Sequence, residues 1–206
     1  RYKKFFILVN NFLRGLKMKQ YPVNLKIDYP EKSNKLTAVF RLVLIIPIVI
    51  ILSFISSYAE ALSLAVVLMI LFREKYPKWW FDWNIGITKF IYRIAAYVLL
   101  MRDEYPSTED EQAVQVYIPY PDTKKDLNRW KPLVKWFLAI PHFIALVFMF
   151  IAVVFCTIFA WLAILFTGRY PRGIFDFVEG FLRWSLRLNA YAFLLTTDQY
   201  PPFKLS

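Results

Sequence analysis

Two long apolar runs dominate the hydrophobic pattern of this chain. Residues 36–72 form a run of 37 residues, and residues 133–166 form a run of 34. A single helix of 37 residues would measure ~55 Å, whereas the hydrocarbon core of a bilayer is only ~30 Å thick. We therefore expect each run to fold back as an apolar helical hairpin in a membrane. Ser56-Ser57-Tyr58 is the expected tip of the first hairpin, and residues 149–157 contain the second.

The depth of these hairpins stays open at this point. Each arm would have about 17 residues, close to the lower limit for crossing a bilayer. A hairpin of this size either spans with help from flanking turns or enters and returns on the same side. We favour spanning, because a helix satisfies all its backbone groups in lipid.

A short alternating segment precedes each apolar run. Val23, Leu25 and Ile27 alternate with more polar residues, and Val114, Val116 and Ile118 do the same in the second half of the chain. Alternation with a period of two, bounded by Tyr-Pro steps, predicts short strands.

An amphipathic helix of about six turns is predicted after each apolar run, over residues 79–101 and 175–195. In the second helix Asp176, Glu179, Arg183 and Arg187 recur at helical spacing beside aromatic residues. Such a helix is expected in the interfacial plane, because spanning would bury two arginines in the membrane at a cost of several kcal/mol each. The candidates for lipid-headgroup binding are Lys89, Arg93, Arg183 and Arg187.

These elements occur twice because the chain is an internal duplication. Tyr76-Pro77 returns 94 residues later as Tyr170-Pro171, and the same offset relates Gly86 to Gly180. We divide the chain into a basic amphipathic segment (1–19), a first repeat (20–106) and a second repeat (107–206). The expected fold is an all-α membrane protein of two tandem repeats, each with an extended segment, an apolar hairpin and an interfacial helix.

The charge distribution indicates an orientation. Although 58% of the residues are hydrophobic, the chain has a net charge of +11. Inside the apolar runs the only basic residues are Arg41 and Lys135, both near the run starts. By the positive-inside rule we expect a multi-pass membrane protein with cytoplasmic termini and anionic phospholipids as partners. The repeats should be related by a pseudo-two-fold axis along the membrane normal. The charges flank apolar runs, so nucleic-acid binding is not expected.

Few residues suggest chemistry. His142 is the only histidine and follows Pro141, so it is either a polar site within the membrane or a side chain packed at a proline kink. Glu60 is the only acid in either apolar run, so it is either functional or solvated near the hairpin tip. The chain has one cysteine, Cys156, which excludes an internal disulfide. We expect no enzymatic activity, metal or cofactor.

The second half of the chain carries the features of a recognisable family. They are the step over residues 165–173, the Phe175-Asp176-Phe177 helix opening, the Arg183, Arg187 and Tyr191 stripe, and the closing segment over residues 194–203. The pattern resembles a family of bacterial multi-pass membrane domains of unknown function. The resemblance covers most of residues 21–204 and implies an inner-membrane location, but no activity.

Three functions are compatible with these features. The leading hypothesis is a non-catalytic scaffold or accessory subunit that binds a partner complex, another copy of itself or anionic lipid through a basic, aromatic cytoplasmic face. The tandem repeats and Glu60 motivate a small transporter or channel. Short hairpins with amphipathic helices also suit a membrane-shaping protein.

Overall fold

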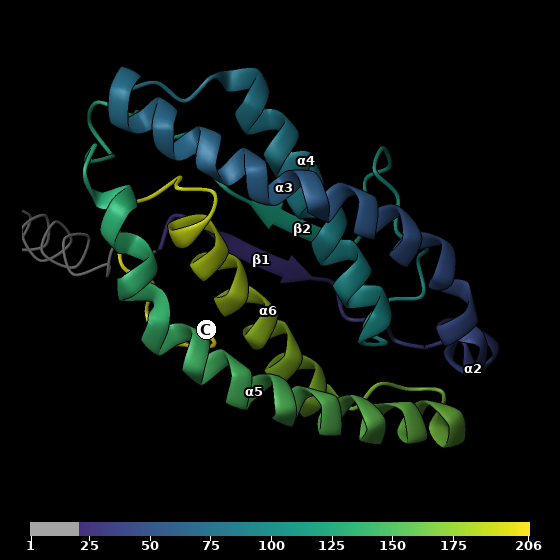
Figure 1. The fold of residues 1–206 in the computed structure, drawn as a ribbon. Coiled ribbons are helices and arrows are strands. Elements are labelled where there is room, and N and C mark those ends of the chain that lie inside the picture. Colours follow the sequence, from purple (N-terminus) through teal and green to yellow (C-terminus); the bar gives the residue numbers. More distant parts are fainter. Residues whose placement is uncertain (1–20) are drawn as a thin grey trace, which may run out of the picture.

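The computed structural model describes residues 21–206, apart from the side chains of residue 42 and of residues 54–63. The protein is mostly helical, as predicted. Its elements in chain order are β1 (Asn24–Ile27), α2 (Lys35–Leu44), α3 (Ile46–Arg73), α4 (Lys78–Val98), β2 (Val114–Tyr117), α5 (Lys131–Thr167) and α6 (Arg172–Ala192) (Figure 1). The basic segment expected over residues 1–19 lies outside the described residues.

The two short strands form where the alternating pattern predicts them. β1 pairs antiparallel with β2, so that Leu25 lies opposite Val116 and Ile27 lies opposite Val114. Neighbouring side chains of a strand point to opposite faces. One face of this small sheet is therefore apolar and largely buried, and exposed Lys26 belongs to the other face.

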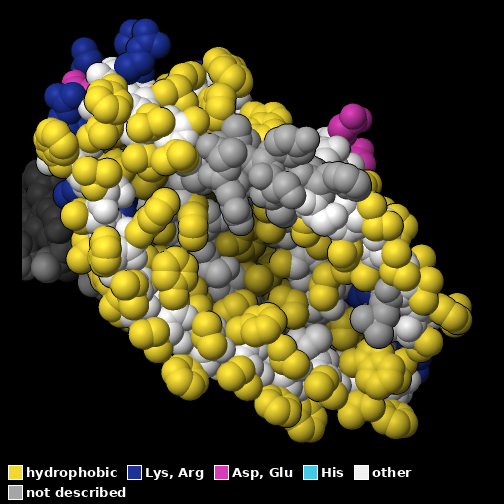
Figure 2. All heavy atoms as spheres, viewed as in Figure 1, with side chains coloured by type: hydrophobic (Ala, Val, Ile, Leu, Met, Phe, Trp, Pro, Cys, Tyr) yellow, Lys and Arg dark blue, Asp and Glu magenta, His cyan; other side chains and the backbone are white. Residues whose placement is uncertain are grey.

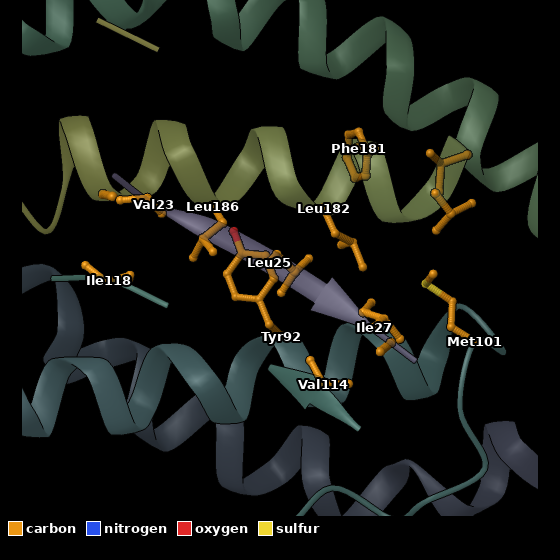
Figure 3. Close-up of a cluster of buried hydrophobic side chains, with 14 of the residues drawn as sticks. Val23, Leu25, Ile27, Tyr92, Met101, Val114, Ile118, Phe181, Leu182 and Leu186 are labelled. Atoms are coloured by element: carbon orange, nitrogen blue, oxygen red, sulfur yellow. The ribbon is translucent and has the colours of Figure 1, made fainter. Parts of the chain in front are cut away.

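The two amphipathic helices also form as predicted, and they cover the apolar face of the sheet. Leu182 and Leu186 of α6 and Tyr92 of α4 surround Leu25 of β1 in one continuous core (Figure 3). On its other side α6 packs along α5. The molecule therefore has three layers, in which α4 and α6 separate the sheet from the long helices α3 and α5.

The hairpin predicted for the second apolar run is wrong, because α5 is one continuous helix of 37 residues. Residues 149–157, where the turn was expected, contain no glycine or proline that would interrupt a helix. Pro141 lies inside α5 and does not end it. The hairpin was inferred from the thickness of a bilayer, and that limit applies only to a helix that crosses one.

The first apolar run does not fold back at its predicted tip either. α3 continues as a helix from Ile46 to Arg73, through Ser56-Ser57-Tyr58. The chain bends earlier, by 49° between the segments Lys35–Arg41 and Ile46–Ser53. Pro47 lies in the first turn of α3. Proline is tolerated there, because the N–H groups of the first turn have no acceptor within the helix. The break therefore precedes the proline.

The two repeats exchange their strands. β1, from the first repeat, packs on α6 of the second, and β2 packs on α4 of the first. The Tyr29 hydroxyl donates to the carbonyl of Tyr170, and the Tyr120 hydroxyl donates to the carbonyl of Tyr76. Each bond joins the segment before one apolar run to the Tyr-Pro step of the other repeat. The repeats are thus interlocked.

The long helices of the two repeats run antiparallel (Figure 1). The Lys35 ammonium at the start of α2 donates to the carbonyl of Phe166 at the end of α5, at 3.3 Å. Conversely, the Arg129 guanidinium before α5 donates to the carbonyl of Leu71 near the end of α3, at 2.8 Å. The beginning of each apolar stretch therefore lies beside the end of the other.

Candidate functional site

The main surface feature is an apolar face built by α2, α3 and α5. Along α5, exposed large hydrophobic side chains extend from Leu133 to Phe166. Figure 2 shows hydrophobic side chains covering α5, with Lys and Arg at the margins of the face. Only 11% of the most apolar stretch of α5 is buried. This exposure distinguishes α5 from the core helix of a soluble domain.

One described helix, α5, is long and apolar enough to cross a membrane by length and composition. The bent pair formed by α2 and the start of α3 would be a second if it were counted as one span. A single such helix is a modest indication of membrane association, and it agrees with the exposed apolar face.

Two buried ion pairs attach the apolar helices to the loops that follow α4 and α6. The Lys135 side chain is fully buried, and its Nζ lies 2.8 Å from a carboxylate oxygen of Asp198. In the first repeat the guanidinium of Arg41, also buried, pairs with the carboxylate of Asp103. Burying an ion is costly unless it is paired, so each pair fixes the position of its loop.

An aromatic ring and a backbone amide support each pair in the same way. The Arg41 guanidinium lies over the Tyr97 ring at 4.4 Å, and the Lys135 ammonium lies over the Tyr191 ring at 5.1 Å, both within cation–π range. The backbone N–H groups of Asn34 and Asn128 donate to Asp103 and Asp198, each at 2.7 Å. The whole constellation is thus duplicated with the repeats.

Sequence reasoning missed these pairs. It noted Arg41 and Lys135 only as basic residues near the starts of the apolar runs and did not pair them with Asp103 or Asp198. The signal was present, because a basic residue and an Asp recur at nearly the same offset in both repeats. Their proximity became visible only in the folded chain.

Among the lipid-headgroup candidates, Arg183 and Arg187 of α6 bind backbone carbonyls of other segments of the chain. Arg183 Nε donates to the carbonyl of Leu25 at 2.9 Å, and its guanidinium pairs with Glu179 at 3.0 Å. Arg187 is 7% exposed and donates to the carbonyl oxygen of Ser206 at 2.8 Å. Burial, assisted by the nearby Arg183 charge, lowers the pKa of Arg187. These contacts make both arginines part of the fold, and their binding to headgroups stays a prediction.

The other two candidates, Lys89 and Arg93, occupy the equivalent face of α4. Lys89 is exposed, and Arg93 donates to the carbonyl of Ser107 at 2.6 Å. Together they line a groove beside β2. The structure therefore places all four basic candidates at the flanks of the sheet.

His142 is packed in an aromatic cluster. The Trp184 indole N–H donates to His142 Nδ1 at 3.0 Å, and the Phe203 ring stacks on the imidazole with centroids 3.9 Å apart. Ile48 and Phe90 hold the equivalent positions in the first repeat, where both are buried. The cluster thus docks the last segment of the chain. The side chain of Glu60 lies outside the described ones.

Within the part of the chain that the structure describes, no three His, Cys, Asp or Glu side chains are grouped so as to hold a metal ion. The contacts that the described residues make are apolar packing, charge pairing and hydrogen bonding.

A family model described as Domain of unknown function (DUF4389) matches the chain twice, over residues 35–108 and 129–204. The two tandem matches confirm the duplication predicted from the offset of 94 residues. No curated protein and no solved structure matches the chain. Because the two matches together span more than half of its residues, the chain belongs to the DUF4389 family of domains of unknown function.

Proposed function

We propose that this protein is a non-catalytic scaffold or accessory subunit of the bacterial inner membrane, which immerses one apolar face in lipid and offers its opposite face to a partner. The apolar side chains exposed along α2, α5 and the described parts of α3 carry this proposal. A monomeric soluble protein rarely exposes so large an apolar patch. Behind this face, buried charges such as Lys135 are used in intramolecular pairs, which suits a structural role.

The length of α5 favours an orientation in the membrane plane. Its 37 residues span ~55 Å. To fit a hydrocarbon core of ~30 Å, the helix would need a tilt of roughly 57°, beyond the usual range of about 0–40°. An in-plane helix has no such limit and buries its apolar flank about 5–10 Å deep in one leaflet. The expectation that each apolar run spans the membrane as a hairpin does not apply to α5, because α5 does not fold back.

Basic residues at both ends of α5 support the same orientation. Arg129 and Lys131 lie at its start, and Arg169 and Arg172 follow its end. A spanning helix would carry one of these clusters to the outer surface, against the positive-inside rule. An in-plane helix keeps both clusters at the cytoplasmic surface, where anionic lipids attract them.

The antiparallel arrangement of α3 and α5 adds a symmetry argument. A two-fold axis that exchanges two antiparallel helices is perpendicular to both of them. Figure 1 shows α3 and α5 from a direction close to this axis. If both helices crossed the bilayer, the axis would lie in the membrane plane and the repeats would be inverted. With both helices in the plane, the axis lies along the membrane normal and both repeats face the cytoplasm.

Cysteine accessibility tests the orientation. In a Cys156→Ser chain, single cysteines are placed before α5 by Lys125→Cys and at its end by Thr167→Cys. A membrane-impermeant maleimide is applied to intact spheroplasts and to inside-out vesicles. We expect both cysteines to react in the vesicles only. Reaction from opposite sides would show that α5 crosses, and release of the chain by alkaline carbonate would overturn membrane embedding itself.

The scaffold function is tested by mass spectrometry of material that co-purifies with the tagged chain in mild detergent. We expect a stoichiometric protein partner or a preference for anionic lipid. A monomeric chain with neither would overturn the proposal.

A membrane-shaping role is the second candidate, because two long helices inserted in one leaflet would act as a wedge. Incorporation of the purified chain into liposomes would then produce tubules visible by electron microscopy. Spherical liposomes at a high protein-to-lipid ratio would exclude this role.

A further inference from the structure

The groove over α6, in the second repeat, is filled by the last residues of the chain. Arg183 Nη1 donates to the carbonyl of Leu205 at 2.9 Å, and Arg187 Nη1 donates to that of Ser206 at 2.8 Å. Gly180 makes room for this segment, since a Cβ there would lie 2.7 Å from Leu205 Cβ. An extended segment therefore binds over α6 through its carbonyls and one apolar side chain.

Among the described residues, no chain segment passes over the equivalent glycine of the first repeat. The residues equivalent to Gly180, Arg183 and Arg187 are Gly86, Lys89 and Arg93. A Cβ added to Gly86 would meet nothing within 4 Å. Lys89 and Arg93 line a groove of about 300 Å³ between α4 and β2. The first repeat thus keeps the glycine and the two cations that hold the extended segment in the second. Arg93 Nη1 already donates to the carbonyl of Ser107, but its Nε has no hydrogen-bond partner among the described residues.

The outer edge of β2 forms one wall of this groove. The Ile27 backbone N–H donates to Glu179 at 2.8 Å, so it points away from β2. Ile27 and Val114, which lie opposite each other, are therefore a non-hydrogen-bonded pair of this antiparallel sheet. The backbone N–H and C=O of Val114 therefore point away from β1. The same holds for Val116, because hydrogen-bonded and non-hydrogen-bonded pairs alternate along the strands. Within the described residues nothing bonds these outward groups. Such an edge is a template for another extended chain.

The sequence explains why the two edges differ. Glu179 of α6 occupies the outer edge of β1, but Ile85 stands at the equivalent position of α4. An isoleucine side chain offers no acceptor to a backbone N–H. The edge of β2 is therefore left without the carboxylate that covers the edge of β1.

We propose that this open groove binds an extended segment of a partner protein, in the manner in which residues 203–206 cover α6. Lys89 and Arg93 donate hydrogen bonds to carbonyl oxygens of this segment, and one of its apolar side chains rests on Gly86. Pairing of its backbone with the edge of β2 adds main-chain hydrogen bonds. The inference rests on the proposed scaffold function and assigns the docking site. The groove opens on the sheet side, away from the apolar face.

A peptide titration tests this site on the full chain in mild detergent. The probe is a fluorescent peptide with the sequence of residues 200–206, Tyr-Pro-Pro-Phe-Lys-Leu-Ser. Gly86→Leu fills the groove without a clash, because the space around Gly86 is open. Gly173→Leu is the matched control, since Gly173 is also an exposed helical glycine with open space around it but lies outside the groove. We expect saturable binding that Gly86→Leu weakens at least tenfold and that Gly173→Leu leaves unchanged.

The other outcomes separate the docking site from the scaffold function. Absence of saturable binding, or equal binding by both variants, overturns the groove assignment. Dimerisation that competes with the peptide and is lost in Gly86→Leu assigns the groove to a second copy and overturns a partner protein as its occupant. Equal recovery of a partner with wild type and with Gly86→Leu overturns the groove as the docking site but leaves the scaffold function standing. Absence of both a partner and anionic lipid from all chains overturns the scaffold function.

Discussion

Lys135 and Asp198 form a buried ion pair, with side chains 1% and 11% exposed and 2.8 Å between the charged atoms. The pair joins the start of the longest apolar helix to the loop that follows α6. It recurs in the other repeat as Arg41 and Asp103. A charge at this depth is stable only while its partner is present, so both loops are bound to the apolar layer by charge.

Removing one member of this pair is expected to destabilise the fold strongly. Asp198→Asn leaves the ammonium of Lys135 buried without a counter-charge, which typically costs about 3–5 kcal/mol. Asp103→Asn should cost less, because the Asp103 side chain is 28% exposed. The measurement is the free energy of unfolding in detergent micelles.

The control for this prediction is Asp82→Asn, which removes the exposed pair between Lys78 and Asp82. An exposed pair of this kind contributes about 0–1 kcal/mol. Equal losses for Asp198→Asn and Asp82→Asn would show that the buried pair does not stabilise the loop.

Alanine substitution of two equivalent glycines should have opposite effects. Gly180→Ala places a Cβ 2.7 Å from Leu205 Cβ, and such overpacking typically costs about 1–3 kcal/mol. Gly86→Ala meets open space, so the higher helix propensity of alanine should stabilise the chain by up to about 1 kcal/mol. Thermal unfolding of both variants measures the difference. A stabilising Gly180→Ala would contradict the close passage of the last segment over α6.

The pairing of His142 with Trp184 predicts strong coupling between these residues. Trp184→Phe removes the N–H that His142 Nδ1 accepts, and an unsatisfied buried acceptor costs about 1–3 kcal/mol. The double change His142→Ile with Trp184→Phe reproduces the Ile48 and Phe90 pair of the first repeat and should recover part of that loss. A double-mutant cycle measures the coupling. Strictly additive effects would refute it.

The basic end of α3 is expected to select anionic lipid. Arg73 and Lys75 are exposed at this end, and each basic residue near an anionic surface contributes about 1 kcal/mol. Arg73→Gln with Lys75→Gln should therefore lower the ratio of anionic to neutral lipid retained in mild detergent, measured by native mass spectrometry. The retention of neutral lipid serves as the control and should not change. An unchanged ratio would count against contact between this end and the headgroups.

Local sequence patterns were sufficient for the secondary structure that depends on local geometry. The alternation around Leu25 and Val116 predicted the strands, and the helical spacing of Glu179 and Arg183 predicted α6. The duplication was visible because its offset hardly varies along the chain. Each of these inferences depends on periodicity or identity along the chain, which needs no knowledge of distant contacts.

The sequence by itself determined the duplication, the strands, the amphipathic helices and the division into apolar and basic stretches. Only the tertiary structure decided how these parts combine. It showed that α5 stays continuous, that the repeats exchange strands, and that Arg183 faces backbone within the fold. These features depend on contacts between residues far apart in the chain, such as Lys135 with Asp198. No local pattern specifies such partners, because each side chain is compatible with several until packing selects one.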